Sequence, residues 1–220
     1  MTHASRVLQV SKSAAERVKE ALIQLATRAN RTLRLSTFDL AVAGVFGALA
    51  IVLAFTPLGL IPVPNISGSA TSLHLPAIIA GILAGPIVGA LVGLVLAIGS
   101  WSLYSGTFLT LANGNPFVAL LAAFLPRILI GVTAYYAYRL LRRWPALAAG
   151  VAGVVGALTN TAGVLGIPLW LGNSALVRSV LAPILSLNVP LEIALALVVT
   201  IPAVAALRTV GKGRIAAARD

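Results

Sequence analysis

The sequence predicts an all-α integral membrane protein, a bundle of six transmembrane helices with both termini cytoplasmic. Three observations predict this fold class. Hydrophobic residues make up 59% of the chain and charged residues only 10%, with a mean hydropathy of +1.01. Neither Asp, Glu, Lys nor Arg occurs from Leu40 to Pro126. Basic residues cluster between long apolar stretches, and a soluble domain of this size could not bury so much apolar surface.

Six apolar segments are marked as membrane spans. The second and third are divided by "AGP" at Ala84–Pro86, which indicates a tight helical hairpin. At a rise of ~1.5 Å per residue, the second span is too short to cross a ~30 Å core alone. It must therefore be tilted, extended into the preceding loop, or enclosed by neighbouring helices. The spans cover approximately residues 38–56, 74–84, 86–104, 116–139, 146–171 and 184–207.

The basic residues orient these spans. Fourteen of the sixteen Lys and Arg residues precede the first span, separate the fourth from the fifth, or follow the sixth. Because positively charged loops stay in the cytoplasm, this distribution places both termini there. It also attributes the net charge of +11 to membrane topology rather than to nucleic-acid binding. The two exceptions are Arg127 and Arg178.

The chain is interpreted as three parts. Residues 1–36 form a basic cytoplasmic segment without the short apolar region of a cleavable signal peptide. Within it, "SAAE" at Ser13–Glu16 fits a helix cap and predicts an amphipathic helix over roughly residues 13–30, with a solvated tail as the alternative. Residues 37–208 form the membrane domain, and residues 209–220 form a basic cytoplasmic tail.

The connections on the outer side differ from the inner ones. Those near residues 57–73 and 105–115 are uncharged and rich in Gly, Pro, Asn, Ser and Thr. Long loops of this composition can fold as lids over the mouth of a cavity. Lids are the favoured interpretation, and ordinary connections are the alternative.

Polar side chains from four spans converge at similar depth. Arg127 lies ~17 Å below the outer end of the fourth span, and Asn160 lies ~16 Å below that of the fifth. Glu192 and Asn188, one helical turn apart, lie in the outer third of the sixth span, while His74 begins the second. Polar residues at this depth usually face a bundle interior or a water-filled cavity. The pattern predicts a binding pocket open to the outside.

Arg127 has two interpretations that the sequence leaves open. It could form a buried ion pair with Glu192 that fixes helix positions. Alternatively, its fork of donors could hold a ligand carboxylate bidentately, with Asn160 adding amide hydrogen bonds. The two can coexist if Glu192 neutralises Arg127 in the empty pocket. Further candidate ligand residues lie towards the outer side, where histidine also serves as a helix cap and aromatic residues as membrane-belt anchors: His74, Trp101, Tyr104 and Asn115.

Small residues recur at four-residue spacing in the first span, at Ala43/Gly47 and Gly44/Ala48. This spacing allows another helix backbone to approach closely. It favours a bundle with one smooth face available to a partner, although packing within the chain is the simpler alternative.

Several kinds of chemistry lack the residues they require. The chain has no cysteine, two histidines and five acidic residues. These are few ligands for a metal and few groups for hydrolytic catalysis, so no metal or cofactor is expected. No Walker motif is present, so this chain is not expected to hydrolyse ATP. Two other classes stay open: an independent channel or proton-coupled carrier with an Arg127–Glu192 relay, and a small membrane enzyme.

Four motifs in order resemble a known family, the substrate-binding S components of energy-coupling factor (ECF) vitamin transporters. The resemblance covers about residues 37–208. Its motifs are "HLPAIIAGILAGPIVGALVGLVLAIGS" at His74–Ser100, "FLPRILIG" at Phe124–Gly131, "GALTNTAGVLG" at Gly156–Gly166 and "NVPLEIALA" at Asn188–Ala196.

The resemblance implies a six-helix protein of the prokaryotic cell membrane that captures a vitamin from outside. It implies as partners a membrane coupling subunit and two cytoplasmic ATPases, with the lipid bilayer around the chain and no nucleic acid. The Pro-Arg and Thr-Asn-Thr motifs look most like the pantothenate branch, with cobalamin or another vitamin as the alternative. By the same resemblance, the coupling subunit would meet the small residues of the first span: Ala43, Gly44, Gly47 and Ala48.

Overall fold

The structure is a computed structural model, and it describes residues 16–17, 19–20, 24, 35–64, 69–172 and 174–217. The chain divides into two units, Met1–Thr37 and Phe38–Asp220. Within the helix predicted over residues 13–30, the described residues are helical and exposed: Glu16, Arg17, Lys19, Glu20 and Gln24. The remainder of that prediction lies outside the described residues.

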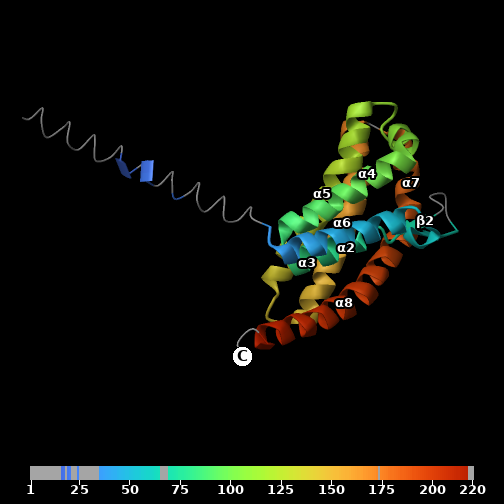
Figure 1. Cartoon of the computed structure of the whole chain (residues 1–220). Coiled ribbons are helices and arrows are strands. Elements are labelled where there is room, and N and C mark those ends of the chain that lie inside the picture. The colour runs from blue at the N-terminus through green and yellow to red at the C-terminus, as the bar shows by residue number, and fades with distance from the viewer. Residues whose placement is uncertain are drawn as a thin grey trace, which may run out of the picture. The chain divides into compact units, whose positions relative to one another are not determined.

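The second unit is a bundle of apolar helices (Figure 1). Within the described chain, five helical stretches are long and apolar enough to span a membrane, and a sixth, α3 (Leu75–Ala84), is shorter. The predicted all-α membrane class is therefore confirmed. The five long stretches are α2 (Thr37–Ala54), α4 (Pro86–Leu111), α5 (Pro116–Leu140), α6 (Pro145–Leu171) and the α7–α8 stretch Ala175–Leu207.

The short helix α3 is enclosed by its neighbours. It packs against α4, α5, α6 and α8, and every residue from Leu75 to Gly81 is buried. A ten-residue helix can therefore lie at membrane depth without facing lipid along that stretch. The chain reverses from α3 into α4 at Gly85, whose φ of 96° suits a residue without a Cβ.

Glycines bring the backbones of α3, α4 and α5 into direct contact. A Cβ added to Gly81 would overlap the backbone of Gly131 on α5, and one added to Gly89 would overlap both of these glycines. A Cβ on Gly93 would strike the carbonyl of Arg127. Gly89 and Gly93 of the third span therefore pack against α5 within the chain. The contact of Gly93 sets the position of Arg127 relative to α4.

A small β-hairpin lies beside α8 and η2, in the connection that the sequence predicts to be a lid. Strands β1 (Leu60–Pro62) and β2 (Ser69–Thr71) pair antiparallel, with Leu60 opposite Thr71. Strand β2 also lies against α8. The described part of the connection thus contains regular strands, and one of them packs on a membrane helix.

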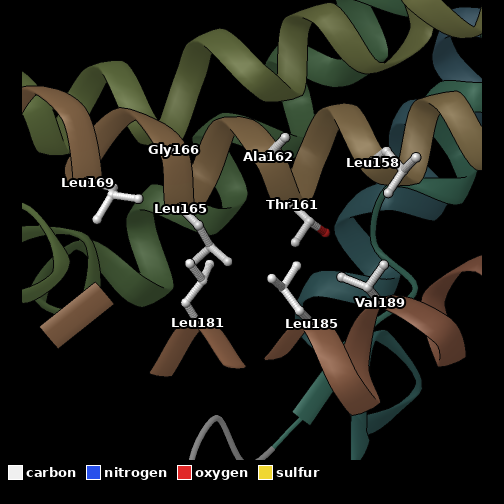
Figure 2. Close-up of a pocket in the computed structure, with 9 residues that line it drawn as sticks. All are labelled: Leu158, Thr161, Ala162, Leu165, Gly166, Leu169, Leu181, Leu185 and Val189. Atoms are coloured by element: carbon white, nitrogen blue, oxygen red, sulfur yellow. The ribbon is translucent and has the colours of Figure 1, made fainter. Parts of the chain in front are cut away.

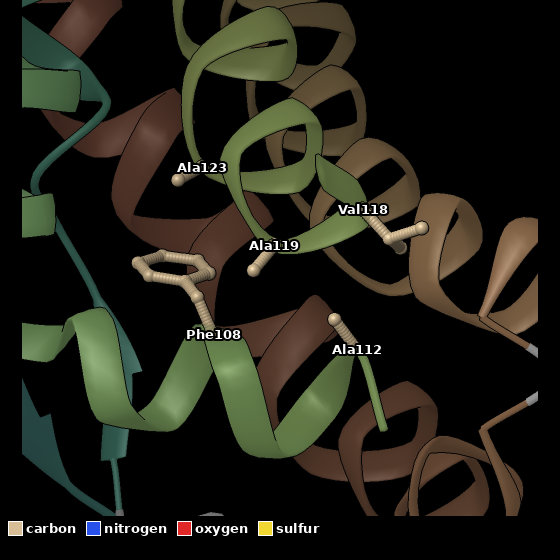
Figure 3. Close-up of a cluster of buried hydrophobic side chains, with 5 residues drawn as sticks. All are labelled: Phe108, Ala112, Val118, Ala119 and Ala123. Atoms are coloured by element: carbon tan, nitrogen blue, oxygen red, sulfur yellow. The ribbon is translucent and has the colours of Figure 1, made fainter. Parts of the chain in front are cut away.

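The prediction of a loop over residues 105–115 is wrong for its first part. Helix α4 bends at Tyr104, where φ is −127° and ψ is 21°, and then continues to Leu111. The continuation is held by Phe108 and Ala112, which pack against Val118, Ala119 and Ala123 of α5 (Figure 3). Burial of this apolar face outweighs the glycine and the threonines that suggested a loop.

The sixth span also begins earlier than predicted. Helix α7 (Ala175–Pro183) occupies most of residues 172–183, which separate the predicted fifth and sixth spans. Ser174 caps it by accepting a hydrogen bond from the Val177 N–H at 3.2 Å. A π-helical turn, η2 (Ile184–Asn188), joins it to α8 (Val189–Ala217). Helix α8 runs through most of the predicted basic tail.

Candidate ligand-binding site

A polar cavity of about 370 Å³ lies at the hairpin end of the bundle. Its walls come from both strands of the hairpin and from α4, α5, α6, η2 and α8. Its charged lining residues are Arg127 and Glu192, which are 8% and 5% exposed. The cavity is lined by Leu60, Thr71, Leu73, Leu96, Ser100, Tyr104, Thr107, Phe108, Leu111, Arg127, Asn160, Thr161, Val164, Leu165, Ile184, Asn188 and Glu192.

Arg127 is held by the backbone of its own helix. Pro126 has no N–H, so the carbonyl of Ala122 lacks its regular helical donor. The Nη1 of Arg127 donates to that carbonyl at 3.4 Å and to the carbonyl of Ala123 at 2.9 Å. The adjacent proline and arginine therefore act together, since the arginine side chain supplies a donor that the proline removes.

An aromatic platform holds the other side of the guanidinium group. The Cζ atom of Arg127 lies 4.9 Å from the ring centroid of Phe108, which is a cation–π geometry. Phe108 in turn stacks on Trp101 at 6.2 Å between centroids, and Trp101 also meets Phe124 at 6.3 Å. Because α4 continues past its bend, a buried ring lies against the arginine.

One edge of the arginine is left for a ligand. Within the described chain, Nη1 makes all of the hydrogen bonds of Arg127, so Nε and Nη2 have no protein partner. This edge carries parallel donors that match the two oxygens of a carboxylate. Asn160 of α6 lines the same cavity, and its amide has no hydrogen bond to another described residue. The cavity thus offers one charged fork and one neutral amide.

Glu192 is partnered by other groups than Arg127. One carboxylate oxygen accepts a hydrogen bond from the Thr71 N–H of the hairpin at 3.0 Å, and the other accepts from the Thr161 hydroxyl at 2.8 Å. Among the contacts of the described residues there is no ion pair between Arg127 and Glu192. The ion-pair interpretation is therefore wrong for this conformation, and Glu192 instead joins the hairpin to α6 and α8.

The remaining predicted ligand residues fall into two groups. Tyr104 and Asn188 line the cavity, whereas His74, Trp101 and Asn115 do not. Asn115 caps α5, accepting hydrogen bonds from the N–H groups of Phe117 and Val118 at 3.0 and 3.2 Å. Trp101 supports Phe108, and His74 is fully buried at the start of α3, with no partner for either ring nitrogen in the described structure.

Among the cavity residues that sequence reasoning missed, three contact Arg127 or Glu192 directly: Phe108, Thr71 and Thr161. Phe108 lies in a segment interpreted as a loop, and Thr71 lies in a connection with no regular pattern. Thr161 belongs to the quoted "GALTNTAGVLG" motif and lies beside Asn160, so its position on α6 could have indicated it. The contact of Thr71 with Glu192 joins residues 121 positions apart and has no local signal.

The small residues of α2 do not share one environment. Gly44 and Ala48 are exposed, with open space where a Cβ of Gly44 would lie, and Ala43 is half-buried. Gly47 is buried, and its Cβ position lies 3.8 Å from the side chain of Val95 on α4. The predicted coupling surface is therefore corrected at Gly47, which packs inside the bundle.

A second hollow of about 190 Å³ lies between α6 and the α7–η2–α8 stretch (Figure 2). Leucines from both sides line most of it. Thr161 and Leu165 line this hollow and the polar cavity alike, so the two spaces adjoin at these residues.

Fold and cavity together define a class, a multi-pass helical membrane protein with a cavity that holds two charged side chains between its helices and its hairpin. The family model described as "ECF transporter, substrate-specific component" matches residues 38–204. The chain belongs to this family, so it is the vitamin-specific S component of an ECF transporter, a substrate-binding subunit, as its motifs predicted.

The chain is also similar to one curated protein along most of its length. The pantothenic acid transporter PanT of Lactococcus lactis subsp. cremoris (strain MG1363) is 31% identical over 190 residues. The match covers 77% of this chain and 93% of the relative. No solved structure matches the chain.

Proposed function

We propose that this S component captures pantothenate from outside the cell and delivers it to an ECF coupling module. The observation that carries the proposal is the unpartnered Nε/Nη2 edge of Arg127, a buried side chain that lines the polar cavity. A buried cation without an anionic partner is costly, and a ligand carboxylate on this edge would supply that partner. The relative's name, pantothenic acid transporter, agrees with an acidic ligand.

The size of the cavity supports a small vitamin. At about 370 Å³ it lies at the lower end of the ~300–1,000 Å³ that ligand pockets usually span. Pantothenate is a short, flexible acid of that scale, whereas cobalamin carries a corrin ring several times larger. Cobalamin also lacks the free carboxylate that Arg127 would hold, so the geometry favours pantothenate.

Membrane topology and partners complete the proposal. With the hairpin end outside and both termini in the cytoplasm, the cavity faces the incoming vitamin, and the basic loop at Arg139–Arg143 faces the cytoplasm. Transport then requires a membrane coupling subunit and two cytoplasmic ATPases. The exposed residues Gly44 and Ala48 of α2, with half-buried Ala43 beside them, are the proposed contact surface for the coupling subunit.

A binding titration on detergent-purified protein tests the proposal, with tryptophan fluorescence or thermal unfolding as readout. Pantothenate and cobalamin are compared, with riboflavin and folate as controls. We expect saturable binding of pantothenate alone. Truncation in Arg127→Ala removes the carboxylate's charged partner, so affinity should fall by at least about thirtyfold.

Arg142→Ala is the matched control, because it truncates an exposed arginine that does not line the cavity, and it should bind as tightly as the parent. Unchanged pantothenate binding in Arg127→Ala would contradict the carboxylate clamp, and binding of cobalamin alone would contradict the ligand assignment. Pantothenate uptake into sealed vesicles by this chain without ATPases would instead favour the independent carrier.

A further inference from the structure

We infer that the cavity reads its ligand at two separate ends, with Arg127 taking the carboxylate and Glu192 accepting hydrogen bonds from hydroxyl groups at the opposite end. The inference rests on the proposed function and adds the orientation of the ligand and the residue that selects for its hydroxyls. The two charged side chains lining one cavity, each held by its own set of partners, carry it.

The two side chains come from different walls of the cavity. Arg127 belongs to α5 and is packed against Phe108 of α4. Glu192 belongs to α8 and is tied to the hairpin through Thr71. Helix α6 packs against both α5 and α8 and contributes Asn160 and Thr161 between them. A ligand that reaches both charged groups must therefore lie across α6.

Glu192 retains capacity to accept further hydrogen bonds. An ionised carboxylate offers about four lone-pair sites, and each oxygen of Glu192 accepts one hydrogen bond, from the Thr71 N–H at 3.0 Å and from the Thr161 hydroxyl at 2.8 Å. At least one acceptor site per oxygen thus remains. Its neighbours fix the carboxylate in place, and the ligand meets an acceptor that is already oriented.

The chemistry of the two ends differs in a way that selects a ligand class. The free edge of Arg127 consists of donors alone and matches an anion, while Glu192 consists of acceptors alone and matches O–H or N–H donors. A carboxylate placed at Glu192 would meet like charge. The preferred ligand is therefore a monocarboxylic acid with hydroxyl donors at its far end, and pantothenate has this arrangement.

The test compares three ligands on the parent protein: pantothenate, panthenol, and N-(3,3-dimethylbutanoyl)-β-alanine. Panthenol replaces the carboxylate by an alcohol and keeps the distal hydroxyls, and the third compound keeps the carboxylate and lacks both hydroxyls. Hydrogen bonds to charged groups predict that each change weakens binding by on the order of tenfold to a hundredfold. Equal binding of pantothenate and the compound without hydroxyls would overturn the inference, whatever the behaviour of any variant.

Glu192→Gln then assigns the effect to its residue. The amide keeps an oxygen that accepts from Thr71 and an NH₂ that can donate to Thr161, so the hairpin retains its anchor. We expect the preference for pantothenate over the compound without hydroxyls to shrink by on the order of tenfold, with the preference over panthenol unchanged. Arg127→Gln should show the converse pattern. Glu20→Gln makes the same chemical change at an exposed glutamate of the first unit and should alter neither ratio.

The outcomes separate this inference from the proposed function. If Glu192→Gln weakens pantothenate and the compound without hydroxyls by the same factor, Glu192 only anchors the hairpin, and the inference fails while pantothenate capture stands. If the parent protein binds none of the three compounds, the proposed function fails and takes the inference with it. A ratio that changes only for the hydroxyl comparison supports the two-ended reading.

Discussion

Phe108 and Arg127 form a contact in which an apolar ring sets the position of a charge. The Phe108 ring packs against Trp101 and α5, so these neighbours restrict its rotation beside the guanidinium group. The Nε/Nη2 edge of the same guanidinium group makes no hydrogen bond to another described residue. At the scale of single residues, ligand affinity therefore depends on a phenylalanine that need not touch the ligand's carboxylate.

Phe108→Leu tests this dependence. Leucine keeps apolar volume but removes the π face, so the cation–π term, about 0.5–2 kcal/mol, is lost and pantothenate should bind about two- to thirtyfold more weakly. Phe108→Tyr keeps the ring and is the matched comparison, expected to stay closer to the parent. A pantothenate titration of both variants measures this effect. Equal pantothenate affinities of Phe108→Leu and the parent protein would exclude a role for the ring.

Residues of the site were predictable from sequence only where a polar or charged side chain stands within an apolar span. Arg127, Asn160 and Glu192 stand out because polar side chains are rare in apolar spans. The partners they use were not predictable. The pairing of Arg127 with its own helix depends on the helix continuing through Pro126, and the bond from Thr71 to Glu192 depends on where a hairpin folds.

At the scale of elements, glycine contacts set the spacing of α3, α4 and α5. Gly89 lies where backbones from two other helices meet it, so a side chain there has no space. Gly44 of α2 has open space in the same test. The two glycines share one residue type and differ only in what surrounds them.

Gly89→Ala and Gly44→Ala form a matched pair of variants. We expect Gly89→Ala to lower the free energy of unfolding by about 1–3 kcal/mol, since the added methyl group forces helices apart. Gly44→Ala should be neutral or slightly stabilising, because alanine is the better helix former by about 0.8–1 kcal/mol. Thermal unfolding in detergent measures both, and equal midpoints would contradict the close packing.

Element boundaries were predictable wherever composition changes sharply. Five of the helix starts in the membrane unit lie within two residues of the predicted ones, at α2, α3, α4, α5 and α6. Helix α4 runs past Gly106 and Thr107 because Phe108 finds a buried site on α5, which only the folded neighbour provides. Helix α7 was missed for a similar reason, since Val177 is buried within a segment that reads as a loop.

At the scale of the whole molecule, the orientation in the membrane decides which solution the cavity faces. The chain contains no cysteine, so a single introduced thiol can be labelled without background. Thr110 is exposed near the end of α4 at the cavity side, and Arg142 is exposed just after α5. Thr110 precedes the start of α5 and Arg142 follows its end, so the full length of this membrane helix separates the two positions along the chain.

Thiol labelling in intact cells tests the orientation. A membrane-impermeant maleimide should label Thr110→Cys and leave Arg142→Cys unlabelled until the membrane is opened, because basic loops stay inside. The reverse pattern would place both termini outside and direct the cavity at the cytoplasm. Labelling of Arg142→Cys after permeabilisation is the control for reactivity of the thiol.

The adjacent Pro126 and Arg127 carry a consequence for how this protein can change over generations. The arginine offers ligand recognition on one edge and repairs its own helix with the other. A lineage that abandons acidic substrates and loses the arginine first leaves the carbonyl of Ala122 without a donor, at a cost of about 1–3 kcal/mol. Replacing the proline restores the helical N–H, so the order of the two substitutions matters. A change to a non-acidic substrate therefore disturbs the helix least when Pro126 is replaced before Arg127.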